Sequence, residues 1–455
     1  MTNAELDRRG FLKAAVAGAT LAAWPRWSFG EEAPNRTGKR PPNIIFILAD
    51  DLSMAALKCY GADRNQGPTS TIDALADGGV RFTRCHTVPV CGPSRCQFLT
   101  GNYPFRTGFV SNSGRIKIWA TPEKFPAIAA CLKEAGYATG MVGKWHHLKP
   151  GPAGWGFDEH LQSPAVAGVY WISPNGAYTV NGRKVSPKER VFFPEVMHDF
   201  AEDFITRHQQ HPFFLYYPMH YPHGGEGLNE TPDKTTPLAT MDRMVGKTVA
   251  VLERLKLRQD TLLIFASDNG GGHDTIGGRK VLGGKFGLQE GGCTVPFIAN
   301  WPGVVPAGKV NTELVDFADM LPTFVELAGG KLPAGKTLDG VSIAAQLRGE
   351  KGNPKGWAFA QIDNRWFVRD DRWKLTDAGE LLDVSDGLFV EKPVRPGAEP
   401  EARKCLDAIA EHLGVREAVK AHPEWAKTTD KKPGEKKPER ERVADDKKER
   451  ADGEQ

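Results

Sequence analysis

The sequence lacks several features that define common protein classes. Its seven cysteines form no C-x-x-C pair, which argues against a zinc ribbon or a dithiol redox motif. Its formal net charge is only +3 and no stretch forms a basic stripe, so we expect no nucleic acid partner. No internal repeat is visible. The odd number of cysteines fits either one cysteine that is consumed by a modification or a set of free buried thiols.

Long apolar runs are scarce as well. The run AAVAGATLAAW near the start is too short for a typical membrane-spanning helix. It follows Arg8-Arg9-Gly10-Phe11-Leu12-Lys13, and together they resemble a bacterial twin-arginine signal; the alternative is a surface helix with two chance arginines. The resemblance implies export of the folded protein by the twin-arginine translocase, to the periplasm or out of the cell. We expect no integral membrane segment in the mature chain.

The rest of the chain has enough material for a large core. Its 455 residues are 40% hydrophobic and 25% charged, which allows one large α/β domain with a smaller appendage, or two or three domains. We predict a signal peptide over 1–30, a linker over 31–42, a main domain over 43–335, a C-terminal subdomain over 336–427 and a disordered tail over 428–455. The tail has nine Lys or Arg against nine Asp or Glu and almost no apolar residues.

Four apolar runs each end in a polar cluster. Ile44 to Leu48 is continuously apolar, as in a parallel strand that is buried on both faces. The other runs are 138–142, 212–217 and 261–266. The clusters that follow are Asp50-Asp51, Lys144 to His146, His220 to His223, and Asp268-Asn269. Because ligands bind beyond the carboxyl ends of the strands in an open α/β sheet, the four clusters predict one shared site.

The acidic clusters favour a metal ion. Adjacent carboxylates at Asp50 and Asp51 repel each other unless a cation lies between them. With Asp268 and Asn269 they form a set of oxygen ligands, which favours calcium or magnesium over zinc. The alternatives are a pair of solvated loop carboxylates at Asp50 and Asp51, and an Asx-type turn at Asp268-Asn269-Gly270.

Helical periodicity separates the strand runs. We predict helices over 70–76, 124–135, 195–208, 239–255, 316–327 and 401–413. The segment 150–190 reads as a long loop with a hairpin turn over 180–183, where Asn181-Gly182 is a typical turn pair. Long loops over α/β sheets often build substrate pockets.

The most specific stretch is residues 91–101, which read CGPSRCQFLTG. It resembles the activation motif of the type I sulfatases, C-x-P-S-R-x-x-x-L-T-G, at Cys91, Pro93, Ser94, Arg95, Leu99, Thr100 and Gly101. The alternative is an ordinary loop before a helix, since Gly-Pro-Ser is common in turns. The resemblance implies that a formylglycine-generating maturation enzyme oxidises Cys91 to an aldehyde. One hydroxyl of the hydrated aldehyde would attack sulfur and the other would expel the sulfate.

Three further stretches resemble motifs of the same family: Gly143 to His146, Ser267 to Gly270, and Lys285 to Gly292. The resemblance implies the alkaline-phosphatase-like fold, an α/β fold in which helices flank a large, mostly parallel central sheet. A small C-terminal antiparallel sheet completes that fold, and the short alternating apolar runs over 357–382 fit it. The main domain, 43–335, would be the catalytic one.

The family also implies a role for each matched residue. Calcium would be held by Asp50, Asp51, Asp268, Asn269 and the modified Cys91. Arg95 would orient and stabilise the formylglycine hydrate. The sulfate oxygens would be surrounded by Lys144, His146, His223 and Lys285. Either His223 or Lys285 would protonate the leaving alcohol.

Two departures from the family pattern leave roles open. Gly224 and Gly225 stand where a proline usually follows His223, so His220 is a rival for its role, or makes a structural hydrogen bond. Thr294 stands where the family commonly has an arginine, and we assign that position no role.

The expected substrate is a sulfate ester, most simply a sulfated glycan. Trp155, Tyr170 and Trp171 are candidates for stacking on its sugar ring; the alternative is that they pack in the interior. Two other functions remain open. One is a phosphoester or phosphonate monoester hydrolase on the same scaffold, and the other is a non-catalytic exported binding protein whose cysteine is never converted.

Overall fold

A computed structural model of the protein describes residues 40–63, 67–113, 116–146, 148–272, 274–352 and 354–428. The predicted signal peptide, most of the predicted linker and the charged tail beyond residue 428 lie outside these ranges. Of the helices within them, none is long and apolar enough to cross a membrane.

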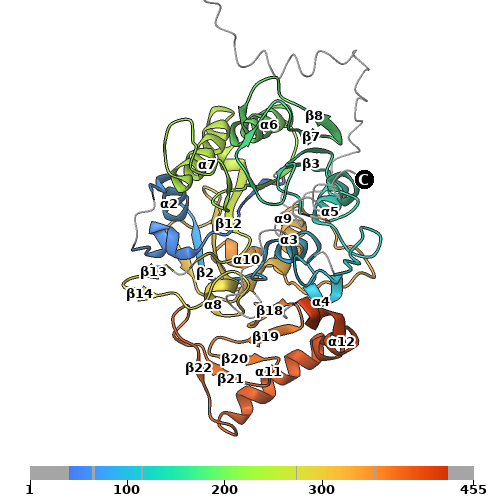
Figure 1. Ribbon diagram of the computed structural model, residues 1–455, viewed down its shortest axis with the longest axis vertical. Helices are drawn as coiled ribbons and strands as arrows, with labels where there is room; N and C mark the ends of the chain where they lie inside the picture. Colours follow the sequence, from blue (N-terminus) through green and yellow to red (C-terminus); the bar gives the residue numbers. More distant parts are fainter. Residues whose placement is uncertain are drawn as a thin grey trace, which may run out of the picture. The chain divides into compact units, whose positions relative to one another are not determined.

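The fold is built on an 11-stranded mixed sheet (Figure 1). Its strands are β1 (Asn43–Ala49), β2 (Val80–His86), β3 (Ala138–Gly143), β4 (Glu159–Gln162), β7 (Tyr178–Val180), β8 (Arg183–Val185), β10 (Phe213–Pro218), β12 (Thr261–Ser267), β15 (Thr294–Asn300), β16 (Lys309–Asn311) and β17 (Val315–Asp316). They follow the order β16-β2-β15-β12-β1-β10-β3-β4-β7-β8, and β17 pairs with β2. The central strands β12, β1, β10, β3 and β4 are parallel, whereas β15, β7 and β8 run antiparallel to their neighbours. The predicted large, mostly parallel sheet is confirmed.

The sheet carries a hydrophobic core on each face, because alternate residues of β1 point to opposite sides. Ile44, Phe46 and Leu48 pack with α3 (Cys91–Thr100), α5 (Ile128–Glu134) and α9 (Met320–Leu327). Ile45 and Ile47 pack with α2 (Ser70–Asp77), α6 (Phe193–Arg207) and α7 (Pro237–Arg254). Figure 1 shows the two sets of helices on either side of β12. The uninterrupted apolar run of β1 is therefore that of a strand covered on both faces.

The predicted strands are confirmed, and most helices match to within two residues at their ends. Two helix predictions were wrong at their starts. The helix over 124–135 begins at Ile128, because Pro126 disfavours a helical Phe125 and Ala127 is extended. The helix over 316–327 begins as a separate 3-10 turn, η5 (Phe317–Asp319), which Asp316 closes with a capping box before α9 starts.

The segment 150–190 is more structured than the predicted loop. It contains η3 (Pro152–Trp155), β4, β7, β8 and the short strands β5 (Gly168–Val169) and β6 (Trp171–Ile172). β7 and β8 form the predicted hairpin, with Asn181 and Gly182 in left-handed conformations (φ 50° and 76°). β5 pairs with β11 (Gly225–Glu226), which ties the segment to the loop after β10, and β6 pairs with β9 (Val191–Phe192).

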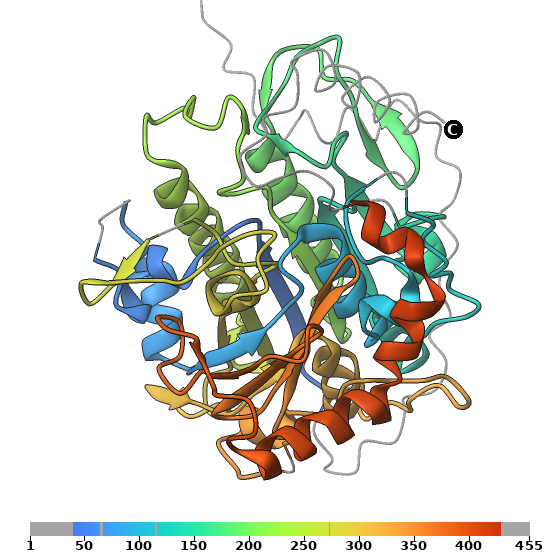
Figure 2. The same cartoon turned by 60° about the horizontal axis from the view of Figure 1, so that its bottom comes forward.

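A five-stranded antiparallel sheet forms the C-terminal region (Figure 2). Its strands are β18 (Ala358–Ile362), β19 (Arg365–Arg369), β20 (Trp373–Thr376), β21 (Leu381–Asp383) and β22 (Lys392–Pro393). α11 (Pro400–Leu413) packs against β19 and β20 through Leu406 and Ala410, and α12 (Val415–Ala421) contacts α4 (Pro104–Thr107). The predicted small C-terminal sheet and the helix over 401–413 are confirmed.

The remaining elements are short. They are η1 (Met54–Ala56), η2 (Lys58–Tyr60), η4 (Arg258–Asp260), β13 (Thr275–Ile276), β14 (Arg279–Lys280), α8 (Glu290–Cys293), α10 (Ala344–Leu347) and η6 (Pro423–Thr428).

Candidate active site

The four predicted polar clusters lie at one edge of the central sheet. Each follows the carboxyl end of a strand: Asp50-Asp51 follows β1, Asp268-Asn269 follows β12, His220 to His223 follows β10, and Lys144 to His146 follows β3. These strands are parallel neighbours in the order β12-β1-β10-β3, so their carboxyl ends meet at the same edge. The structure thus brings together the clusters that the sequence predicted to share a site.

Cys91 is the first residue of α3 and is only 1% exposed. The positive end of the helix dipole therefore lies at this side chain. The N–H of Gly92 in the same first turn donates to Oδ1 of Asn112 at 3.1 Å. Burial raises the pKa of the Cys91 thiol well above its usual value, although Lys144 acts in the opposite direction. An unmodified Cys91 therefore stays protonated at neutral pH and is a weak nucleophile.

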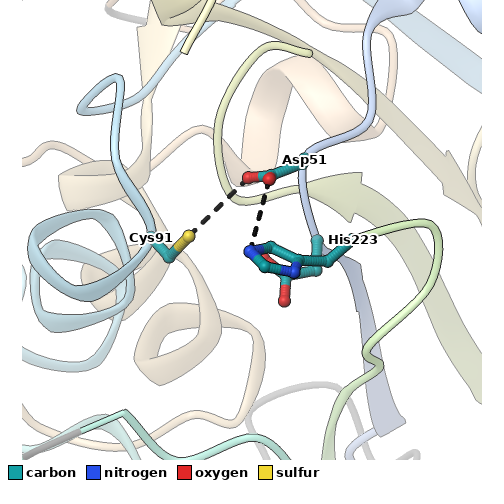
Figure 3. A group of neighbouring side chains, drawn as sticks. Asp51, Cys91 and His223 are labelled. Atoms are coloured by element: carbon teal, nitrogen blue, oxygen red, sulfur yellow. Dashed lines mark hydrogen bonds and ion pairs between the residues drawn. The ribbon is translucent and has the colours of Figure 1, made fainter. Parts of the chain in front are cut away.

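Asp51 links Cys91 to His223 (Figure 3). Oδ1 of Asp51 lies 3.7 Å from the Cys91 sulfur, and Oδ2 lies 3.5 Å from Nε2 of His223. Nδ1 of His223 donates to the carbonyl of Gly224 at 2.6 Å, which holds the ring with Nε2 toward Asp51. Ligand atoms of Asp50, Asp51, Cys91 and His223 all lie within 4.8 Å of one another. His223, predicted as a sulfate contact, thus lies within a group that could hold a metal ion.

Two lysines neutralise the adjacent carboxylates after β1. Nζ of Lys144 lies 2.7 Å from Oδ2 of Asp50, and Nζ of Lys285 lies 2.7 Å from Oδ2 of Asp51. Burial by itself would raise the pKa of Asp50, but Lys144 and Arg95 outweigh burial and hold the pKa below its usual value. Asp50 is therefore ionised at neutral pH despite being completely buried.

Arg95 cross-links the carboxylates from the next turn of α3. Its Nε and Nη2 donate to Oδ2 of Asp268 at 3.0 and 2.7 Å. Nη2 also lies 3.5 Å from Oδ1 of Asp50, and Nη1 donates to the carbonyl of Lys144 at 3.4 Å. Burial would lower the pKa of Arg95, but Asp268 outweighs it and raises that pKa. Arg95 therefore holds the carboxylates of Asp50 and Asp268 close to each other.

A cavity of about 130 Å³ opens between these groups. It is lined by Cys91, Asn112, Lys144, His146, Val166, Ala167, His223 and Lys285. The four residues that were predicted to surround the sulfate oxygens therefore all line it. Ligand pockets commonly have volumes of roughly 300–1,000 Å³, so this cavity fits a small group and the rest of a substrate would lie outside it.

Three of the lining residues were missed by the sequence analysis. Asn112 lies in the turn-like stretch SNSG, and Val166 and Ala167 lie in the segment 150–190. No motif marks any of them. The one available signal was general: a long segment after a sheet strand is a common source of pocket walls.

Two buried oxygens fit a hard metal ion. Within the described residues, Oδ1 of Asn269 is buried and accepts no hydrogen bond. Oδ1 of Asp50 is also buried and accepts no hydrogen bond, although it lies in an ion pair with Nη2 of Arg95 at 3.5 Å. Nδ2 of Asn269 donates to Oδ1 of Asp51 at 2.9 Å, which fixes the amide orientation. Buried polar atoms rarely lack a partner, and carboxylate and amide oxygens are the ligands that calcium prefers. The residues present therefore fit the predicted calcium ion.

Asp268 stands beside this group with both oxygens already engaged. Oδ1 accepts the N–H of Asp51 at 3.1 Å, and Oδ2 accepts from Arg95. Burial raises the pKa of Asp268, and Asp50 adds to the effect. The hydrogen bond from the N–H of Asp51 to Asp268 therefore fixes the backbone of Asp51. Asp268 itself is the third carboxylate of the group, beside Asp50 and Asp51.

His220 and the aromatic candidates have structural contacts. Nε2 of His220 hydrogen-bonds with Oγ of Ser163 at 2.7 Å, and burial lowers the pKa of its ring well below the usual value. Trp155 and Tyr170 are 1% and 0% exposed, and Trp171 packs on Phe192. For Trp155 and Tyr170 the alternative of interior packing holds, because both rings lie inside the two cores of the sheet.

A second buried charge network holds the loop that carries Lys285. Glu290 accepts from Nη1 of Arg369 at 2.5 Å and lies 3.3 Å from Nζ of Lys374, both from the C-terminal sheet. Lys374 also donates to the carbonyl of Leu288 at 2.6 Å. Burial would raise the pKa of Glu290, but Arg369 and Lys374 outweigh it and hold the pKa well below its usual value. The C-terminal sheet thus fixes the backbone that follows Lys285.

Comparisons with known proteins identify the family and the fold. Residues 42–330 match the model of the Sulfatase family. The chain is 33% identical to arylsulfatase A of Homo sapiens, over 70% of each protein. It is 28% identical to the N-acetylgalactosamine-6-O-sulfatase of Bacteroides thetaiotaomicron, over 86% of this chain and 92% of that one. The crystal structure of Ps i-CgsB in complex with k-i-k-neocarrahexaose matches with a TM-score of 0.72 at 27% identity, over 84% of this chain and 94% of that one.

The fold and the site together define a sulfuric ester hydrolase with the alkaline-phosphatase-like fold. The chain belongs to the sulfatase family, which confirms the resemblance carried by the sequence motifs.

Proposed function

We propose that this sulfatase is an exported, calcium-dependent enzyme that carries a formylglycine at position 91 and removes sulfate from a carbohydrate. The observation that carries the proposal is the group of Asp50, Asp51, Cys91 and His223, because their ligand atoms lie within 4.8 Å of one another beside a cavity lined with cations. Sulfate ester hydrolysis needs a nucleophile, a metal ion and cations that bind the sulfate. The modified Cys91 would supply the nucleophile, the carboxylates would hold the metal ion, and the cations that line the cavity would bind the sulfate.

The aldehyde would supply the nucleophile of the reaction, and the calcium ion would supply a Lewis acid. A hydrated aldehyde has two hydroxyl groups on one carbon, so one can attack sulfur and the other can expel sulfate as the aldehyde forms again. Calcium, as a Lewis acid, would lower the pKa of the attacking hydroxyl. The residues that would hold it are Asp50, Asp51, Asp268, Asn269 and the modified residue 91.

The chain's own cations would bind the sulfate group. Lys144, His146, His223 and Lys285 line the cavity, where fixed positive groups stabilise the charge that develops on the sulfate oxygens. The positive end of α3 adds to the same field. Nε2 of His223 and Nζ of Lys285 lie 3.4 Å apart, so either could protonate one leaving oxygen.

The relatives support a sulfated carbohydrate as the substrate. N-acetylgalactosamine-6-sulfatases and an ulvan-active sulfatase are similar to this chain over two thirds or more of its length. The structurally similar Ps i-CgsB was crystallised with k-i-k-neocarrahexaose. The cavity holds a small group only, which suits a sulfate on a larger sugar.

Export is proposed from the first thirty residues alone. Their twin-arginine stretch would send the protein through the twin-arginine translocase after folding, so the maturation enzyme would convert Cys91 in the cytoplasm. Cys96, five positions further on, stays a thiol in that reducing compartment and cannot pair with Cys91 before conversion. In the folded chain Cys96 is a small buried residue of the core on α3.

The test joins a mass measurement to a comparison of substrates. Protein made together with the maturation enzyme should show, in the peptide that contains residue 91, the mass of formylglycine instead of cysteine. It should hydrolyse 4-nitrophenyl sulfate much faster than 4-nitrophenyl phosphate. An unconverted cysteine in the active protein would refute the aldehyde, faster turnover of the phosphate would favour a phosphoester hydrolase, and no turnover of either would favour a binding protein.

A further inference from the structure

We propose that the exposed ring of Phe286 binds the sugar ring that carries the sulfate ester, at the mouth of the cavity beside Lys285. The inference rests on the proposed function, because it names the surface that would hold the leaving group. The cavity of about 130 Å³ has room for a sulfate group, so the sugar has to lie outside it. A surface next to the cavity must therefore contact the sugar.

Phe286 lies at this place. Lys285, the preceding residue, lines the cavity, and the centre of the Phe286 ring lies 5.4 Å from its Nζ. That same Nζ lies 2.7 Å from Oδ2 of Asp51. A single side chain therefore separates the Phe286 ring from the carboxylate next to Cys91.

The Phe286 side chain is exposed to solvent. At 56% exposure it is the most exposed large apolar side chain, and the one aromatic among the exposed ones, in the described ranges of the chain. Its neighbour Leu288, by contrast, packs against the buried residues Val88 and Val90. Burial does not explain why an aromatic ring stands at position 286.

The backbone of Phe286 has a conformation that disfavours a phenylalanine. Its φ is 68°, a left-handed conformation that a bulky side chain rarely adopts and that glycine adopts freely. Asp51 and His146, both at the site, share this conformation with φ of 64° and 66°. Strained conformations of non-glycine residues cluster at functional sites. A phenylalanine retained here at a conformational cost therefore points to a use for its ring.

The loop presents the ring from a fixed position. The N–H of Phe286 donates to the carbonyl of Pro89 at 2.7 Å, and the N–H of Lys285 donates to the carbonyl of Gly271 at 3.3 Å. A Cβ added at Gly284 would lie 2.5 Å from the carbonyl oxygen of Gly271, so the two backbones are in direct contact. A platform held in this way loses little conformational freedom when a substrate binds.

The chemistry of the ring selects the class of ligand. The face of an aromatic ring carries negative charge density, and one face of a pyranose presents C–H groups with partial positive charge. Phe286 would therefore stack on the apolar face of a sulfated pyranose while Lys285 binds the sulfate that it carries. Trp155 and Tyr170 cannot take this role because they are buried.

The experiment compares the wild type with Phe286→Ala, Phe286→Gly and Phe286→Trp, and uses Leu332→Ala as the matched control because Leu332 is a 46% exposed apolar side chain elsewhere. The substrates are 4-nitrophenyl sulfate and the fastest of a panel of monosulfated galactose, glucosamine and N-acetylgalactosamine. The second readout is inhibition by inorganic sulfate, which occupies the cavity alone. Melting temperatures report folding.

The Ala and Gly variants should raise KM about tenfold for both substrates, the size of an aromatic stacking contact, with little change in kcat. The inhibition constant of inorganic sulfate should stay within twofold in all variants, and Trp should retain the wild-type KM. The Gly variant should melt higher than the wild type, because it relieves the left-handed strain, and yet bind substrate worse. Leu332→Ala should change nothing.

An unchanged KM in Phe286→Gly would overturn the proposal. A weaker affinity for inorganic sulfate in parallel with KM would also overturn it, because that result assigns the effect to a displaced Lys285. If the wild type hydrolyses no sulfate ester at all, the proposed function fails, and the role of Phe286 fails with it for that separate reason.

Discussion

Replacing Glu290 by Gln tests whether the C-terminal sheet supports the active site. Glu290 is 3% exposed and its partners Arg369 and Lys374 are 2% exposed each. The substitution removes the central negative charge of the network and leaves two buried cations. One carboxylate remains for them, because Glu391 lies 2.8 Å from Lys374.

The magnitude follows from that burial. Removing one partner of a buried ion pair costs about 3–5 kcal/mol of folding free energy. We expect the low end of this range, about 3 kcal/mol, because Glu391 still pairs with Lys374 and Gln has nearly the shape of Glu. With a sensitivity of about 2 °C per kcal/mol for a large domain, the melting temperature should fall by roughly 6 °C. Glu290 begins α8 directly after the loop that carries Lys285, so its loss should displace Lys285 slightly. Because small displacements in an active site are costly, kcat/KM should also fall on the order of 10- to 100-fold.

Thermal unfolding and steady-state kinetics check the prediction against Glu202→Gln. Glu202 pairs with Arg254 at 2.8 Å, but it is 41% exposed, so its loss should cost less than about 0.5 kcal/mol. Equal melting temperatures for the two variants would refute the argument. A stable Glu290→Gln protein with normal kcat/KM would refute the link to Lys285.

The pH dependence of the Glu290 effect has a definite sign. Because the pKa of Glu290 is held well below 4.5 in the folded protein, its contribution to stability is fully present above that value. It is lost as the pH falls through the lower, folded pKa. The difference between wild type and variant should therefore stay constant down to about pH 5 and shrink in more acidic solution.

Four further predictions concern the chemistry. Cys91→Ser, made in a bacterium with only a cysteine-type maturation enzyme, should lose nearly all sulfatase activity, and most activity retained would contradict the formylglycine. A chelator should abolish activity and calcium should restore it, whereas active protein containing only stoichiometric zinc would contradict the oxygen shell. Whichever of His223 and Lys285 is the general acid, its Ala variant should lose far more activity on a sugar sulfate than on 4-nitrophenyl sulfate, whose leaving group needs no proton; an equal loss would assign that residue to sulfate binding alone. Exchanging the twin-arginine signal for one that exports unfolded chains should lower formylglycine occupancy at residue 91 by mass spectrometry, and unchanged occupancy would remove the case for cytoplasmic conversion.

Much of the candidate site could be predicted, because each of its polar clusters directly follows an apolar strand in the sequence. The apolar run of β1 and the carboxylates at Asp50 and Asp51 are adjacent in the chain, and the same holds for β12 with Asp268. Parallel strands bring such ends to one edge, so a local pattern was enough to predict a shared site. The stretch that begins at Cys91 added a specific motif, and the family comparisons confirm the class of enzyme that it implied.

By itself, then, the sequence determined the strands, the acidic residues that follow them and, through the stretch that begins at Cys91, the sulfatase family, because neighbouring residues carry each of these signals. Only the tertiary structure decided which cation meets which carboxylate, as in Arg95 with Asp268 at a separation of 173 positions. It also decided that Tyr170 is buried while Phe286 is exposed, and that Glu290 joins the C-terminal sheet to the loop of Lys285. These features depend on how distant segments pack against one another. Ion pairs between distant residues and the exposure of a single side chain produce no periodic pattern in the sequence, so they could not be predicted from it.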